Sequence, residues 1–157
     1  MSRRRQATKR PLTEDAKYHS SLVSRLINTV MLSGKKSTAE RIVYGAFDQM
    51  AAANAGSNPM EILQRAVDNA KPRLEVKPRR VGGATYQVPI EVTTDRQLSL
   101  AVRWIVALAD KRKGTPMTKA LAAEIMDAFQ GQGAAIRRRD EVHKMAQSNK
   151  AFAHFRW

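Results

Sequence analysis

Hydrophobic and polar residues alternate at helical spacing along most of the chain. In residues 21–33 the large apolar side chains recur every three or four positions, which places them on one face of an amphipathic helix. The pattern predicts six helices, of which the last is mostly polar with a weak apolar stripe. After the helix at 21–33, the others are expected at about 37–55, 58–71, 94–113, 115–130 and 134–148.

Local signals mark where several of these helices begin. Ser37 and Glu40 have the spacing of a capping box, in which a hydroxyl and a carboxylate each satisfy a free backbone amide. Asn58, followed by a proline at the first helical position, predicts the start of the third helix. Thr94 or Asp95 is the expected cap of the fourth.

Between the third and fourth helices the period changes from helical to alternating. Residues 73–92 are typical of two strands joined by a tight turn at Gly82 and Gly83. Pro78 and Pro89 cannot donate to a strand ladder, so each should face an open edge. A ribbon of two strands is marginal alone in water, so its base is expected to pack on the helices while its tip projects. The fold class predicted is therefore mostly α, a single six-helix domain with one projecting β-hairpin between the third and fourth helices.

Length and composition restrict the chemistry. A chain of 157 residues that is 43% hydrophobic can bury a core of its own. It has no cysteine, which excludes disulfides, thiol nucleophiles and cysteine-ligated zinc. No apolar run approaches the ~20 residues of a spanning helix, and none follows the basic N-terminus as in a secretory signal. We expect a cytoplasmic protein with no cofactor and no metal.

Charge gives the clearest indication of a partner. Lys and Arg number 28 against 14 Asp and Glu, so the formal net charge is +14. Repulsion of this size opposes compaction unless a polyanion neutralises it, which favours nucleic acid or an anionic membrane as partner. No helix joins a broad apolar face to a uniformly basic one, so membrane binding is the weaker choice.

Catalysis finds little support in the sequence. Glu14 with Asp15, and Asp140 with Glu141, are neighbours that would point about 100° apart on a helix. Neither pair therefore predicts a paired acid and base. The sequence shows no set of a nucleophile, a base and an orienting group, so we do not expect an enzyme.

The first seventeen residues have the character of a basic arm. Five bases and no acid occur in the first ten residues, and no helix or strand pattern is readable there. Such arms are often disordered until they bind nucleic acid, although a solubilising tail is the alternative. We therefore divide the chain into the arm, residues 1–17, and a helical domain, residues 18–157.

Lys35 and Lys36 precede the predicted second helix, whose first amides are free. Helix dipole, amides and ammonium groups together favour an anion. The segment departs from a nucleotide-binding P-loop, because Thr29 stands where the first glycine is needed and Lys36 takes the Ser/Thr position. A backbone phosphate of RNA or DNA is the better ligand, and an ordinary turn with solvated lysines is the alternative.

Further basic residues gather around the hairpin and near two helix ends. A basic ribbon can lie along a phosphate backbone, or its charge can simply prevent edge pairing. The residues are Lys71, Arg73, Lys77, Arg79 and Arg80 at the hairpin, Lys111 to Lys113, and Arg137 to Arg139. Three consecutive helical positions span about 200°, so part of the last run must be solvated or ion-paired.

Aromatic residues are concentrated at the C-terminus. Phe152, Phe155 and Trp157 lie beside Lys150 and His154. They could stack on bases or riboses, or dock the segment 149–157 onto the domain.

Several long strings of the sequence resemble one known family. Over nearly its whole length the chain is similar to the bacterial small-subunit ribosomal protein numbered seven. The matching strings are Ser2–Arg5, Gly34–Glu40, Glu75–Pro89, Arg103–Val106, Val142–Ala146 and Asn149–Trp157. Ala16 and His19 depart from the proline and glycine that the resemblance implies there.

The resemblance implies a fold, a role and a set of contacts. It implies six helices with a β-ribbon after the third, and a protein that binds the 3′ major domain of the small-subunit ribosomal RNA and nucleates assembly of the subunit head. The residues implied to meet ribosomal RNA are Arg3, Arg4, Arg5, Lys9, Arg10, Lys35, Lys36, Lys71, Arg73, Lys77, Lys111, Arg112 and Lys113. Those implied to lie near exit-site transfer RNA and messenger RNA are Arg79, Arg80, Val81, Gly82, Gly83, Arg137, Arg138, His143, Lys144, Lys150 and Trp157. Implied neighbours are the small-subunit proteins numbered nine and eleven, with the chain itself a monomer in the ribosome.

A second hypothesis remains open at this point. An architectural DNA-binding protein could insert the basic ribbon into a minor groove, and it would be expected to form a symmetric dimer with two ribbons.

Overall fold

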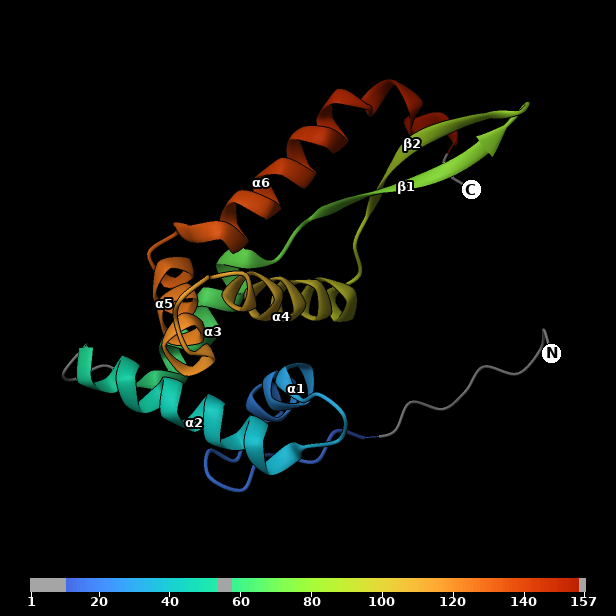
Figure 1. Ribbon diagram of the computed structural model, residues 1–157. Coiled ribbons are helices and arrows are strands. Elements are labelled where there is room, and N and C mark those ends of the chain that lie inside the picture. Colours follow the sequence, from blue (N-terminus) through green and yellow to red (C-terminus); the bar gives the residue numbers. More distant parts are fainter. Residues whose placement is uncertain (1–10, 54–57, 156–157) are drawn as a thin grey trace.

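The computed structural model describes residues 11–53 and 58–155 and confirms the predicted fold class (Figure 1). Within these residues a two-stranded hairpin lies between the third and fourth of six α-helices, and a short 3-10 helix follows the sixth. None of the described helices is long and apolar enough to cross a bilayer. The elements are α1 (Ser21–Val30), α2 (Lys36–Ala53), α3 (Pro59–Ala70), β1 (Leu74–Val81), β2 (Ala84–Glu91), α4 (Thr94–Asp110), α5 (Met117–Phe129), α6 (Gly133–Ser148) and η1 (Lys150–Phe155).

The core forms around α5, which packs against α2, α3, α4 and α6. The apolar stripes that predicted the helices meet there, and Phe47, Leu121 and Ile125 are among the side chains that lose all contact with water. Fully burying a side chain of this size contributes about 1.5–3 kcal/mol. The helices are therefore held by packing of their apolar faces, as their periodicity predicts.

The helix starts differ in detail from the sequence signals. Asn58 caps α3 as predicted, and its side chain accepts the Met60 N–H at 3.0 Å. The capping box at Ser37 is wrong, because α2 begins one residue earlier, and Glu40 lies 3.8 Å from Lys36 instead. The prediction that Thr94 or Asp95 caps α4 is also wrong.

For α4, the helix already includes Thr94 and Asp95, and Thr93 is the N-cap without a side-chain hydrogen bond. The first helix ends at Val30 instead of residue 33, and α4 ends at Asp110 instead of residue 113, so its last turn is not cationic. The chain then turns through Ser33 and Gly34, whose φ angles of 52° and 74° lie in the left-handed region, so a helix cannot continue.

The hairpin has the predicted tight turn. Val81 pairs with Ala84, so Gly82 and Gly83 form a two-residue turn with φ of 58° and 90°. Two positive φ angles match the twist of the strands and favour glycine at both positions.

The hairpin is supported by helix packing farther along its length than predicted. Figure 1 shows α6 running beside both strands with η1 against β2. The rings of Phe152 and Phe155 lie 5.1 and 5.2 Å from the ring of Tyr86, centroid to centroid. Tyr86 is only two residues from the start of β2, so packing extends well beyond the base. We call β1, β2, α6 and η1 together the hairpin arm.

Candidate nucleic-acid interface

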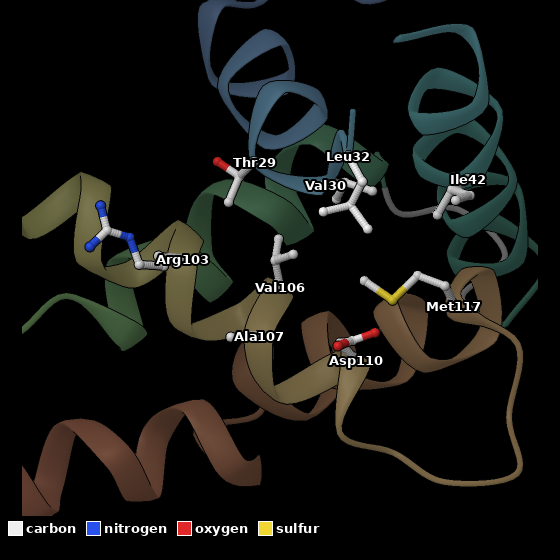
Figure 2. A pocket seen from close by; sticks show the side chains of 9 residues that line it. All are labelled: Thr29, Val30, Leu32, Ile42, Arg103, Val106, Ala107, Asp110 and Met117. Atoms are coloured by element: carbon white, nitrogen blue, oxygen red, sulfur yellow. The ribbon is translucent and has the colours of Figure 1, made fainter. Parts of the chain in front are cut away.

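Two loops that are far apart in the sequence lie next to a hollow of about 340 Å³: Leu32 of one loop lines it, and so do Asp110 and Met117, the residues on either side of the other loop. The first is the α1–α2 loop, residues 31–35, and the second is the α4–α5 loop, residues 111–116. Leu32 from the first loop, Val106 from α4 and Met117 at the start of α5 point into this hollow, as Figure 2 shows. We call it the loop pocket. Lys35 and Lys111 to Lys113 lie on these two loops, and no lysine is among the residues that line the hollow.

Three lysines on these loops are free to meet an anion. Lys35, Lys111 and Lys113 are exposed, and none has an ion-pair or hydrogen-bond partner for its ammonium group among residues 11–53 and 58–155. Lys36 lies 3.8 Å from Glu40, but that pair is solvated and worth little. The α2 N-terminus adds its dipole to the same charge. The loops therefore offer several cations that need not give up a protein partner to bind phosphate.

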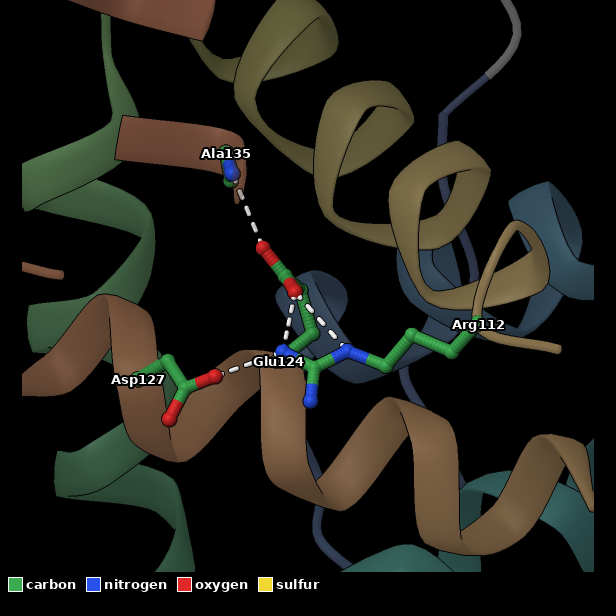
Figure 3. A network of polar contacts seen from close by, with 4 residues as sticks. All are labelled: Arg112, Glu124, Asp127 and Ala135. Atoms are coloured by element: carbon green, nitrogen blue, oxygen red, sulfur yellow. Dashed lines mark hydrogen bonds and ion pairs between the residues drawn. The ribbon is translucent and has the colours of Figure 1, made fainter. Parts of the chain in front are cut away.

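Arg112 lies between two of these lysines, but its half-buried side chain is held by two carboxylates of α5 (Figure 3). Its guanidinium donates to Glu124 at 3.1 and 2.5 Å and to Asp127 at 2.5 Å. These hydrogen bonds, first from Asp127 and then from Glu124, raise the pKa of Arg112 above its usual value. The predicted contact between Arg112 and RNA stays a prediction, and the structure adds a role in fixing the α4–α5 loop.

Glu124 was missed by the sequence reasoning. It is fully buried, and its second oxygen accepts the Ala135 N–H at 2.8 Å at the start of α6. The available signal was a carboxylate set in the apolar stripe between Leu121 and Ile125, where a charge needs a partner. Glu124 thus ties the α4–α5 loop to α6.

The hairpin arm carries a second set of free cations. Arg80, Arg137, Lys144 and Lys150 of the arm, and Arg73 immediately before β1, are exposed, and their charged groups have no protein partner in the described part of the chain. Other predicted site residues are neutralised in part. Lys71 lies 2.6 Å from Asp68, Lys77 lies 3.5 Å from Glu75, and Arg138 lies 3.1 Å from Glu141, while Arg79 is half-buried.

His143 joins the hairpin to α6. Its Nε2 accepts the backbone N–H of Arg73 at 2.9 Å, which requires a neutral ring. Burial, then the nearby charge of Arg139, lower the pKa of His143 below its usual value. The predicted place of His143 beside transfer RNA is untested, and the geometry shows a structural contact at the start of β1.

The aromatic C-terminal segment docks on the domain through two of its rings. Phe152 and Phe155 pack on Tyr86 and so use their faces within the protein. Trp157 and the predicted contacts Arg3, Arg4, Arg5, Lys9 and Arg10 lie outside the described residues. In the described ranges no three His, Asp or Glu side chains cluster closely enough to hold a metal ion.

Comparison with known proteins decides between the hypotheses. The model of the family described as "Ribosomal protein S7p/S5e" matches residues 2–150. The chain belongs to this ribosomal protein family. It is 54% identical over 157 residues to the small ribosomal subunit protein uS7 of Francisella tularensis subsp. holarctica strain OSU18, with all of both chains covered. The uS7 proteins of subsp. novicida strain U112 and subsp. tularensis strain WY96-3418 are equally similar over the same length.

Family membership fixes the general role. The protein is a structural, non-enzymatic component of the small ribosomal subunit that binds ribosomal RNA, and it is located in the ribosome in the bacterial cytoplasm. The architectural DNA-binding hypothesis is set aside on this ground.

Proposed function

We propose that the protein binds the 3′ major domain of the small-subunit ribosomal RNA directly and nucleates assembly of the subunit head. The observation that supports this most is that the α1–α2 and α4–α5 loops, which carry the free lysines, both adjoin the loop pocket. Free lysines on both loops neutralise backbone phosphates and release counterions. The A-form major groove is too narrow for side chains, so RNA shape and unpaired nucleotides guide the fit.

The ribosomal-RNA surface extends from the loops to the base of the hairpin. It comprises Lys35, Lys36, Lys71, Arg73, Lys77, Lys111, Arg112 and Lys113, together with Arg3, Arg4, Arg5, Lys9 and Arg10 of the N-terminal basic arm, residues 1–17. The free lysines contribute most of the electrostatic affinity. Lys71, Lys77 and Arg112 contribute less, because a phosphate must compete with their carboxylate partners.

The hairpin arm forms a second surface, which lies near exit-site transfer RNA and messenger RNA, with the small-subunit proteins nine and eleven as neighbours. Its support is the set of free cations along one continuous arm, Arg80 at the tip and Arg137, Lys144 and Lys150 along α6 and η1. The tip 81–83, Arg79, Arg138, His143 and Trp157 complete it. The chain acts there as a monomer.

Two matched triple variants test this division of the surface. Replacing Lys35, Lys111 and Lys113 by alanine should weaken binding to head-domain RNA and flatten its salt dependence by about 0.7–0.9 log unit for each lost phosphate contact. Replacing Arg137, Lys144 and Lys150 removes the same charge and should leave that slope nearly unchanged. Binding is measured by filter retention across a salt series. Equal slopes for both variants would show that net charge alone acts, and would contradict the proposal.

A further inference from the structure

The loop pocket has features that a phosphate surface does not need. Its walls are mainly apolar, with Leu32, Ile42, Val106 and Met117 among them, and Leu32 is 79% exposed although it is a large apolar side chain. A volume of about 340 Å³ is near the lower end of the ~300–1,000 Å³ usual for ligand pockets, which suits one nucleoside-sized group. An apolar hollow that has the Arg103 side chain among its lining residues is complementary to a flat base attached to a charged backbone.

Two charges of opposite sign stand at the ends of this pocket. Arg103 and Asp110 both lie on α4 and both line it. Seven residues apart, they share a helix face about 10.5 Å from each other, too far to pair directly. Neither has a hydrogen-bond or ion-pair partner within the part of the chain that the structure describes. Figure 2 shows the Asp110 carboxylate beside Met117 and the Arg103 guanidinium at the opposite end, with Val106 between them.

The Arg103 end of the pocket is the more basic one. A neighbouring hollow of about 180 Å³ shares Thr29 and Arg103 with the loop pocket and is also lined by Arg25. Arg25 donates to Ser99 at 3.3 Å and has no acidic partner in the described ranges. The loop pocket therefore runs from Arg103, beside which Arg25 lines the neighbouring hollow, across apolar side chains to the carboxylate of Asp110.

We infer that the loop pocket receives one unstacked guanine nucleotide of the bound RNA, with its phosphate at Arg103 and its Watson–Crick edge at Asp110. This rests on the proposed function as an RNA-binding protein. The apolar side chains cover the faces of the base, as in other sites that take bases out of the stack. Leu32 closes over the base from the α1–α2 loop.

Asp110 selects guanine among the four bases. An ionised carboxylate only accepts hydrogen bonds. Guanine presents two adjacent donors, N1–H and the 2-amino group, which match its two oxygens. Adenine and cytosine place an acceptor nitrogen beside their amino group, and uracil has a single N–H between two carbonyls, so each would leave the carboxylate unsatisfied or repelled.

Methyl signals of Met117 provide a direct test. The full chain, labelled with ¹³C-methyl methionine, is titrated with uridine pentanucleotides that carry guanosine, inosine, adenosine or cytidine at the centre. These RNAs have equal charge, so non-specific attraction cancels in the comparison. The guanosine RNA should shift the Met117 signal and bind at least tenfold more tightly than the adenosine or cytidine RNA. Inosine, which lacks the 2-amino group, should fall between them.

Variants separate the two ends of the pocket. Asp110→Asn should abolish the tenfold preference for guanosine, whereas Arg103→Gln should weaken all four RNAs alike. Glu61→Gln removes an exposed carboxylate elsewhere and should change neither. The inference is overturned if none of the four RNAs shifts the Met117 signal, or if all four shift it equally. Either result would be expected if a partner protein filled the pocket. Head-domain RNA is titrated in parallel. If only the inference about the pocket fails, the protein still binds head-domain RNA; if the proposed function fails, that RNA does not bind either.

Discussion

At the residue scale, Asp15 fixes the entry to the helical domain. Its buried carboxylate accepts the N–H groups of Lys17 and Tyr18 at 3.1 and 3.0 Å and the Tyr44 hydroxyl at 2.7 Å. Burial alone would raise the pKa of Asp15, but these hydrogen bonds, with that of Tyr44 foremost, lower it below its usual value. Burial and the same bond raise the pKa of Tyr44 to about 12.

Replacing Asp15 by asparagine should lower the free energy of unfolding by about 1–3 kcal/mol at pH 7, because hydrogen bonds to a charged group are lost. A carboxyl with a lowered folded pKa stabilises above its unfolded value of 3.8, so the difference from wild type should shrink as pH falls below that value. Urea denaturation at several pH values measures this, with Glu14→Gln as the exposed control. The Tyr44 titration should also move down toward 10 in the variant, and an unchanged Tyr44 would contradict the account.

The sequence did not predict this anchor. Asp15 was assigned to a basic arm with no readable structure, and Tyr44 lies 29 positions away on α2. Periodicity reports which face of a helix is apolar, but it does not report which distant hydroxyl reaches a carboxylate. Asn58 was predictable because its partner, Met60, is two residues away.

At the scale of elements, Glu124 determines how the α4–α5 loop and α6 meet. Gly133, with φ of 94°, begins α6 where an added Cβ would lie 2.8 Å from the Cβ of Asp127. The chain can therefore turn there only with glycine, and the next residues bring the Ala135 amide onto Glu124.

Glu124→Gln should cost about 3 kcal/mol of unfolding free energy, the low end of the range for breaking a buried pair, because Asp127 still holds Arg112. Asp127→Asn, at a 43% exposed side chain, should cost about 1 kcal/mol or less. Thermal and urea denaturation compare the two. A larger loss in the Asp127 variant would contradict the assignment of Glu124 as the main anchor.

His143 makes the attachment of the hairpin sensitive to pH. Because its folded pKa is lowered, its contribution is complete above the unfolded value of 6.5 and is lost as pH falls through the folded pKa. Arg73, Arg139 and Asp140 are the charged groups around it, and only Asp140 opposes the shift.

Wild-type protein should therefore lose stability as pH falls below 6.5, and the Arg73 amide should lose protection from hydrogen exchange there. His143→Gln, which keeps an acceptor that does not titrate, should flatten this dependence. Histidine NMR titration and hydrogen exchange measure both. An Arg73 amide whose exchange follows only the intrinsic pH effect would contradict the contact.

The elements were predictable to the extent that their signals are local. Six helices and the turn at Gly82 and Gly83 follow from spacing and turn chemistry. The length of the hairpin's contact with α6 did not follow, because the apolar stripe of α6 is weak and the packing depends on Tyr86 meeting Phe152. No periodic pattern in the sequence predicts the helix η1.

At the scale of the whole molecule, the fold converts separate basic runs into two surfaces. The α1–α2 and α4–α5 loops both adjoin the loop pocket, and the hairpin arm carries other cations. The sequence predicted which runs are basic and, through family resemblance, that they meet RNA. It did not show that Arg112 turns inward while its lysine neighbours stay free, because that depends on carboxylates of α5.

The most direct test of the account is competition for the full chain across a salt series. Labelled head-domain RNA of the small subunit is challenged with duplex DNA of equal length and with unrelated structured RNA. Specific binding predicts that head RNA is preferred by at least ~10³-fold and keeps that preference as salt rises. If all three compete equally and binding collapses with salt, the +14 charge alone accounts for the affinity and the proposed function is contradicted.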